Sequence, residues 1–317
     1  MKQCPVDACF APETTCAVGH LNLNECPSWR SSTEQNQAVA PSNDELVLAW
    51  SGNALGLTDV GFVAGRTRPT IVGIIGAENA GKTTLLTAWY LLVGRGVGTS
   101  ERHRFAGSFT LRGWETVARA MQWAPGLPPK FPAHTSSRGG RGQGLLHLAF
   151  RENGQQLRDY LFTDAPGMWF QRWALNENAA DAAGARWILE NADIFLVVAD
   201  RAALSGEDRG SARAALQLLV RRIAATREGR SVILVWAKSD IQIPPEIEKA
   251  VREAVYSQIP DTEEFNVSIR SQDENHHGQG VGLTTLLNRV LEIRRRKQSL
   301  PSAQAGSSDP LFLFGAR

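Results

Sequence analysis

The sequence predicts an α/β protein with a doubly wound, mostly parallel sheet, and three observations support this prediction. Apolar runs that look like strands alternate with helical patterns over most of the chain. The apolar run 70–76 leads directly into a glycine-rich loop and then into a helical pattern. Two further runs, 194–200 and 231–237, have the continuous hydrophobicity of parallel strands that are covered on both faces.

The remaining elements follow from periodicity and turn signals. Asn153-Gly154 separates two strand-like runs and predicts a hairpin. Residues 211–226 place Leu216, Leu219 and Ile223 on one face of an amphipathic helix. We expect strands at 70–76, 144–152, 156–163, 194–200, 231–237 and 264–269, and helices at 82–93, 114–122, 182–191, 211–226, 247–259 and 281–296. The rest of the stretch 94–134 is expected to be an irregular insertion.

Composition excludes some classes of function. Hydrophobic residues make up 43% of the 317 residues, which is enough for a core, and the net charge of +2 gives no reason to expect nucleic acid or membrane as a partner. No apolar run approaches the ~18 residues of a membrane span. The N-terminus lacks the apolar stretch of a signal peptide, so we expect a cytoplasmic protein.

The loop from Gly76 to Thr83 has the phosphate-binding (Walker A) pattern G-x-x-x-x-G-K-[ST], between a strand and a helix. Gly76 and Gly81 let the backbone N–H groups wrap an anion at the helix N-terminus. Lys82 supplies positive charge to the β- and γ-phosphates, and the Thr83 hydroxyl completes the coordination of Mg²⁺. The other nucleotide-binding residues expected from this loop are Glu78, Asn79, Ala80 and Thr84.

A second pattern, D-x-x-G, ends the strand before Gly167. Asp164 is expected to hold Mg²⁺, directly or through water, and the Gly167 N–H to contact the γ-phosphate. A switch also needs a threonine that reaches Mg²⁺ and the γ-phosphate. Thr135 is the candidate, with the serines at 136 and 137 as alternatives.

A third pattern, Ala237-Lys-Ser-Asp240, resembles the guanine-reading sequence N-K-x-D. A carboxylate at Asp240 accepts hydrogen bonds from the guanine N1–H and amino group, while the Lys238 stem stacks on the base. Ser268 occupies the place of a loop that touches guanine through its backbone. Ala237 replaces the usual asparagine, which leaves ATP, or no strong base preference, as the alternative.

Two residues bear on hydrolysis. Met168 follows Gly167, where many GTPases have a glutamine that orients the attacking water. Methionine cannot do this, so another group or a partner must orient the water, or hydrolysis is slow. In the GTPases that these motifs resemble, an apolar residue at the position of Met168 often accompanies an asparagine at the position of Asn79 that helps to bind K⁺. The resemblance therefore implies Asn79 as a candidate K⁺ ligand, and the alternative is that it only caps its own loop.

All four cysteines lie in the first 26 residues. Disulfides are of little use in the cytosol, so the cluster favours a structural zinc site, which would also supply the folding energy of so short a segment. Free thiols or a redox pair are the alternative. Zinc takes four ligands, and the five candidates are Cys4, Cys9, Cys16, Cys26 and His20.

Together, residues of about 70–296 resemble the translation-factor-related (TRAFAC) class of P-loop GTPases. A closer resemblance is to a bacterial double-GTPase family of conflict and defence systems. It rests on the cysteine-rich head, the lead-in 50–55, the loop AENAGKTTLL and the segment 105–114. The resemblance implies a second GTPase encoded as a neighbour.

We therefore expect a GTP-hydrolysing molecular switch that acts through a protein partner, with GTP, Mg²⁺ and Zn²⁺ as cofactors. The sequence does not decide whether copies of the chain also associate through the switch regions. The alternatives are an adaptor that binds nucleotide with little hydrolysis and an ATPase of the same fold. The expected organisation is a zinc-ribbon-like module at 1–30, a linker and lead-in at 31–69, a P-loop GTPase domain at 70–297 and a flexible tail with an apolar end at 298–317.

Overall fold

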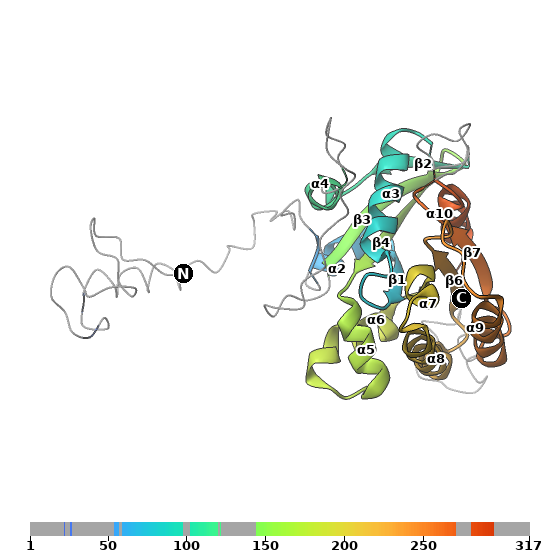
Figure 1. Ribbon diagram of the computed structural model, residues 1–317. Helices are drawn as coiled ribbons and strands as arrows, with labels where there is room; N and C mark the ends of the chain where they lie inside the picture. The colour runs from blue at the N-terminus through green and yellow to red at the C-terminus, as the bar shows by residue number, and fades with distance from the viewer. Residues whose placement is uncertain are drawn as a thin grey trace, which may run out of the picture. The chain divides into compact units, whose positions relative to one another are not determined.

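The computed structural model describes residues 54–56, 59–97, 102–119, 144–270 and 280–294, together with Asn22, Cys26 and Met121. The chain divides into two compact units, residues 1–49 and 50–317. The elements described below all belong to the second unit, and Figure 1 labels most of them along the chain. None of the helices in the described ranges is long and apolar enough to cross a membrane.

One sheet organises the described part of the chain. Its seven strands lie in the order β2-β3-β4-β1-β5-β6-β7. The five from β4 to β7 along this order are parallel, whereas β3 is antiparallel to both β4 and β2. The strands are β1 (Thr70–Gly76), β2 (His103–Gly107), β3 (Gly144–Glu152), β4 (Gln156–Asp164), β5 (Ile194–Asp200), β6 (Ser231–Ala237) and β7 (Glu263–Val267).

Helices cover both faces of this sheet. On one face, the buried residues of α5, α6, α8 and α9 pack against alternate strand residues such as Ile75, Phe195 and Trp236. On the other face, α3, α4 and α10 pack against the intervening residues, such as Ile74, Leu196 and Val235. Because both faces are covered, the central strands are apolar without interruption, as the sequence predicted.

The helices are α2 (Val60–Ala64), α3 (Lys82–Gly94), α4 (Leu111–Arg119), α5 (Gly167–Leu175), α6 (Ala183–Asn191), α7 (Arg201–Ser205), α8 (Arg209–Thr226), α9 (Pro245–Gln258) and α10 (Leu283–Glu292), with a 3₁₀ turn, η3, at Ala180–Ala182. The predicted α/β class and mostly parallel sheet are confirmed, and the predicted helices are present with shifts of a few residues at their ends.

One part of the expected irregular insertion is regular, and the helix predicted within the same stretch begins earlier than expected. Residues 103–107 form the edge strand β2, because they pair antiparallel with the hairpin strand β3 and bury His103. The helix expected at 114–122 begins earlier, at Leu111, and is recorded to Arg119. Its Trp114 is fully buried and donates a hydrogen bond from its indole N–H to the His147 carbonyl at 2.9 Å. A long-range contact of this kind leaves no periodic signal in the sequence.

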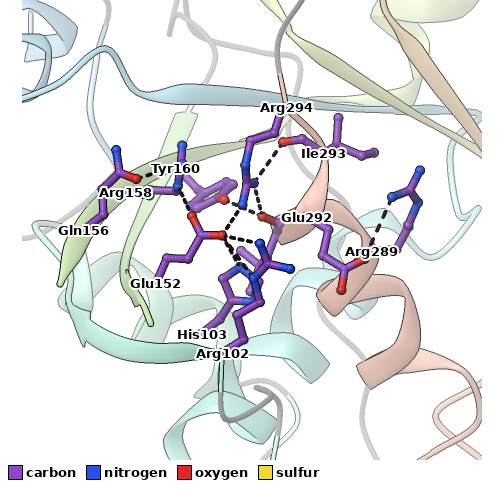
Figure 2. Close-up of polar contacts among 11 residues, drawn as sticks. Arg102, His103, Glu152, Gln156, Arg158, Tyr160, Arg289, Glu292, Ile293 and Arg294 are labelled. Atoms are coloured by element: carbon purple, nitrogen blue, oxygen red, sulfur yellow. Dashed lines mark hydrogen bonds and ion pairs between the residues drawn. The ribbon is translucent and has the colours of Figure 1, made fainter. Parts of the chain in front are cut away.

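A charge cluster around the buried Glu152 lies at the far end of the hairpin from Asp164. Figure 2 shows the Glu152 carboxylate surrounded by Arg102, Arg158 and Arg294, which come from three separate parts of the chain. Burial alone would raise the pKa of Glu152. The hydrogen bond from Arg158 and the charges of Arg294 and Arg158 outweigh burial and lower the pKa from 4.5 to about 2. The cluster therefore ties the segment after α10 to the turn end of the β3–β4 hairpin.

Candidate functional site

The candidate site lies where the parallel strands end. Gly76 ends β1, Asp164 ends β4, Asp200 ends β5 and Ala237 ends β6. The register pairs Gly76 with Val198, and Asp200 with Ala237, so these strand ends lie at the same edge of the sheet. Ligands of doubly wound α/β folds bind at this edge, because the loops and helix N-termini converge there.

The phosphate-binding loop has the backbone expected of an anion cradle. Gly81 is the N-cap of α3 with φ 94°, and Asn79 is also left-handed with φ 62°. Ala80 is fully buried, while Glu78 and Asn79 are exposed and Thr84 is half-buried. The loop therefore turns its backbone around the start of α3, where the helix dipole favours a negative charge.

Lys82 is buried inside this loop. Its ammonium donates to the carbonyl oxygens of Gly76 at 3.1 Å and Ala77 at 2.7 Å. Burial lowers the pKa of Lys82 from 10.5 to about 8, although the charges of Asp164 and Glu78 act in the opposite direction. A phosphate group placed in the loop would offer this ammonium the strong counter-charge that backbone carbonyls lack.

Two oxygen ligands suited to Mg²⁺ lie side by side. The Thr83 hydroxyl donates to the Asp164 carboxylate at 2.9 Å, which joins the start of α3 to the end of β4. Mg²⁺ prefers hard oxygen ligands and is usually held by one or two protein groups together with phosphates and water. A hydroxyl and a carboxylate at this distance fit that requirement.

Gly167 begins α5 directly against the phosphate-binding loop. A Cβ on Gly167 would lie 2.2 Å from the Glu78 backbone nitrogen, so any larger residue would force the two segments apart. The half-buried Met168 follows it. The segment after Asp164 is thus placed to respond to whatever occupies the loop.

The residues that the sequence predicted to read the base form a second group at the same edge. The Ser268 hydroxyl donates to Asp240 at 2.6 Å and accepts from the Arg270 N–H at 3.0 Å. Lys238 has a left-handed φ of 57°, and its ammonium donates to the Asn79 carbonyl at 2.9 Å. These contacts connect the loops after β6 and β7 with the phosphate-binding loop.

The structure brings together most of the residues that the sequence singled out. The residues of the phosphate-binding loop lie at the carboxyl edge of the sheet, and so do Asp164, Gly167, Lys238, Asp240 and Ser268. Thr135 lies outside the described residues, as do Cys4, Cys9, Cys16 and His20. Cys26 is described, is buried and is not in a disulfide. In the described ranges no group of three metal-binding side chains is present.

Sequence reasoning missed Asp200. It ends β5, its side chain is 8% exposed, and it pairs with Lys238 at 2.8 Å. A signal was available, because a carboxylate that ends a buried parallel strand next to the nucleotide edge is placed where ligands bind. His147 was also passed over. It is buried and contacts Asp159 through Nε2 at 2.9 Å, while its Nδ1 accepts from the Phe109 N–H.

Four features together define a GTPase domain of the P-loop class. They are the sheet, the phosphate-binding loop, the paired Thr83 and Asp164, and the loop that carries Lys238 and Asp240. This chain belongs to the Double-GTPase 2 family, whose family model matches residues 70–291. Comparison with curated proteins gives no significant match.

Comparison with solved structures gives several matches to parts of this chain. They include the bacterial selenocysteine-specific elongation factor EF-Sec (15% identity, TM-score 0.36, 70% of this chain and 28% of that one). The GTPase-like domain of S. cerevisiae Ski7 bound to GTP has 14% identity and a TM-score of 0.40 over 73% of this chain and 51% of that one. The third, sup35 complexed with GDP, has 17% identity and a TM-score of 0.30 over 63% of this chain and 36% of that one. The chain spans at most about half the length of these structures.

Proposed function

We propose that this protein binds and hydrolyses GTP as a Mg²⁺-dependent switch that acts through a protein partner. The observation that carries the proposal is the contact between Thr83 and Asp164 at 2.9 Å, next to the buried Lys82. It joins the phosphate-binding loop to the segment that begins with Gly167. When bound, Mg²⁺ would neutralise charge on the β- and γ-phosphate oxygens.

The roles of the side chains follow from their positions. Lys82 exchanges its carbonyl partners for phosphate oxygens and stabilises the charge that develops on the transferring group. The backbone N–H groups of the loop and the start of α3 hold the phosphates in place. Gly167 lies against Glu78, so a γ-phosphate in the loop alters the packing of α5.

Choice of base rests on Asp240. Its carboxylate is held by the Ser268 hydroxyl at 2.6 Å and is suited to accept from the N1–H and amino group of guanine. Adenine has no matching pair of donors, so we propose GTP in preference to ATP. The replacement of the usual asparagine by Ala237 keeps an ATPase as the competing assignment.

A second function, nucleotide binding with little intrinsic hydrolysis, is favoured by Met168. Its thioether is a weak hydrogen-bond acceptor and has no donor with which to orient a water molecule. In that case a partner, which the family resemblance suggests is a second GTPase, would complete the site in trans. A role in bacterial defence belongs to the same proposal.

The test is phosphate release under multiple-turnover conditions with GTP or ATP and Mg²⁺, in KCl and in NaCl. Lys82→Ala is the negative control, because it removes the phosphate-binding charge. GTP turnover that Lys82→Ala abolishes supports the switch, whereas turnover of ATP alone overturns the choice of base. Tight GTP binding without turnover selects the second function, and equal rates in the two salts reject K⁺ at Asn79.

The zinc-ribbon-like head remains a proposal. The expected result is one zinc ion per purified chain, lost when two of the four cysteines are replaced by serine. A purified chain that contains no zinc, and whose stability is the same with and without the cysteine substitutions, would reject the zinc site.

A further inference from the structure

Ala237 raises the question of what holds the base-reading loop in place. An asparagine at this position would offer an amide to neighbouring loops, whereas alanine offers only a methyl group. Ala237 is 6% exposed, and its Cβ lies 3.8 Å from the point where a Cβ on Gly81 would be. The two loops therefore pack closely at this point, with no polar group of residue 237 to join them.

Lys238 makes the connection instead. Its ammonium donates to the Asn79 carbonyl of the phosphate-binding loop at 2.9 Å and to Asp200 Oδ2 at 2.8 Å. Asn79 and Lys238 both adopt left-handed backbone conformations. The ammonium thus joins the two loops directly, and the Asp200 carboxylate, which belongs to neither loop, holds it in place.

Asp200 is well placed to fix that ammonium. It is the last residue of β5 and pairs in register with Ala237, the last residue of β6. Its other oxygen, Oδ1, accepts from the Ala202 N–H at 2.9 Å and so caps α7. The cap fixes the orientation of the carboxylate, and the side chain of Asp200 is only 8% exposed.

We infer that Asp200 is a positioning residue of the nucleotide site: it holds Lys238 against the phosphate-binding loop and replaces the bracing amide that Ala237 lacks. The inference rests on the proposed function. Lys238 is 34% exposed, so water screens the ion pair and reduces its contribution to the stability of the fold. Its main effect is on bound nucleotide, because a displaced Lys238 no longer covers the base.

Asp200→Asn separates positioning from capping. The amide oxygen still accepts from Ala202, but the amide nitrogen that replaces Oδ2 cannot accept from an ammonium. The measurement is the rate at which fluorescently labelled GDP and GTP leave the full-length protein, with Asp208→Asn as matched control. Asp208 is exposed and makes no side-chain cap at the start of α8.

We expect release to become about tenfold faster, which corresponds to about 1.4 kcal/mol. The preference for GTP over XTP stays unchanged, because Asp240 is untouched, and the unfolding temperature without nucleotide stays the same. The effect of Asp200→Asn disappears in a Lys238→Met background, since the group that Asp200 positions is then missing. Ala237→Asn, added to Asp200→Asn, restores slow release.

Each other outcome has a definite meaning. Wild-type release rates in Asp200→Asn, or an equal acceleration in Asp208→Asn, overturn the inference while the proposed function stands. The same follows if Asp200→Asn accelerates release equally in the Lys238→Met background. If the wild-type protein binds no guanine nucleotide, the proposed function fails and the inference fails with it.

Discussion

Base choice offers the sharpest test of the site, through Asp240→Asn. In the structure the Asp240 carboxylate is held by the Ser268 hydroxyl at 2.6 Å, and the asparagine oxygen keeps that acceptor. The change therefore alters which groups of the base are recognised, with little effect on the loop. Guanine presents an amino group where xanthine has a carbonyl oxygen, so an amide suits xanthine and a carboxylate suits guanine.

The size of the effect follows from the two hydrogen bonds to a charged group. Each such bond contributes about 1.5–3 kcal/mol, and losing one of them while leaving a donor opposed to a donor weakens GTP binding by at least about 100-fold. XTP binding strengthens by a similar factor. The preference is thus reversed, while contacts to the phosphates are unchanged.

The assay is competition of GTP, XTP, ITP and ATP against a fluorescent nucleotide, for the wild type and the variant. Asp208→Asn serves again as the control for an exposed aspartate on a helix N-terminus. An Asp240→Asn variant that keeps its GTP preference would refute the assignment of Asp240 as the base-reading residue. A wild type that prefers ATP would refute the whole description of this loop.

Three further predictions follow. Gly167→Ala places a Cβ 2.2 Å from the Glu78 nitrogen and is expected to lower GTP turnover at least about tenfold. The control, Gly210→Ala, has open space around it and leaves turnover unchanged. Equal turnover rates in the two variants would contradict the proposed contact. Trp169 lies on α5, two residues after Gly167, and packs against Gly184, so a shift of α5 changes its surroundings. Trp169→Phe is therefore expected to remove most of the fluorescence difference between the GDP- and GTP-bound forms, and persistence of that difference would assign it to another tryptophan. Glu152→Gln is expected to cost about 2–3 kcal/mol at pH 7 in urea unfolding. The folded-state pKa of Glu152, about 2, lies below its ordinary 4.5, so its contribution to the free energy of unfolding is present above pH 4.5 and is lost as the pH falls towards 2. If the wild type and the variant lose stability identically as the pH falls, the charge cluster does not stabilise the fold.

The sequence determined the local part of the site because that part is contiguous. A buried strand, a glycine-rich loop and a helix start are joined within residues 70–83, so their geometry follows from short-range rules. The apolar runs of β5 and β6 were equally legible, since strands covered on both faces carry no polar residues. From these runs the parallel sheet, and the edge where its ligands bind, could be predicted.

Tertiary structure decided the features that join distant segments. The edge strand β2 exists because β3 pairs with it, and its own sequence shows little strand character. Likewise Glu152 meets three arginines from separate parts of the chain, and Asp200 meets a lysine that follows the next strand. Charges and edge pairings of this kind depend on which segments the fold places side by side, whereas a strand, a turn or a loop pattern depends mainly on its own residues.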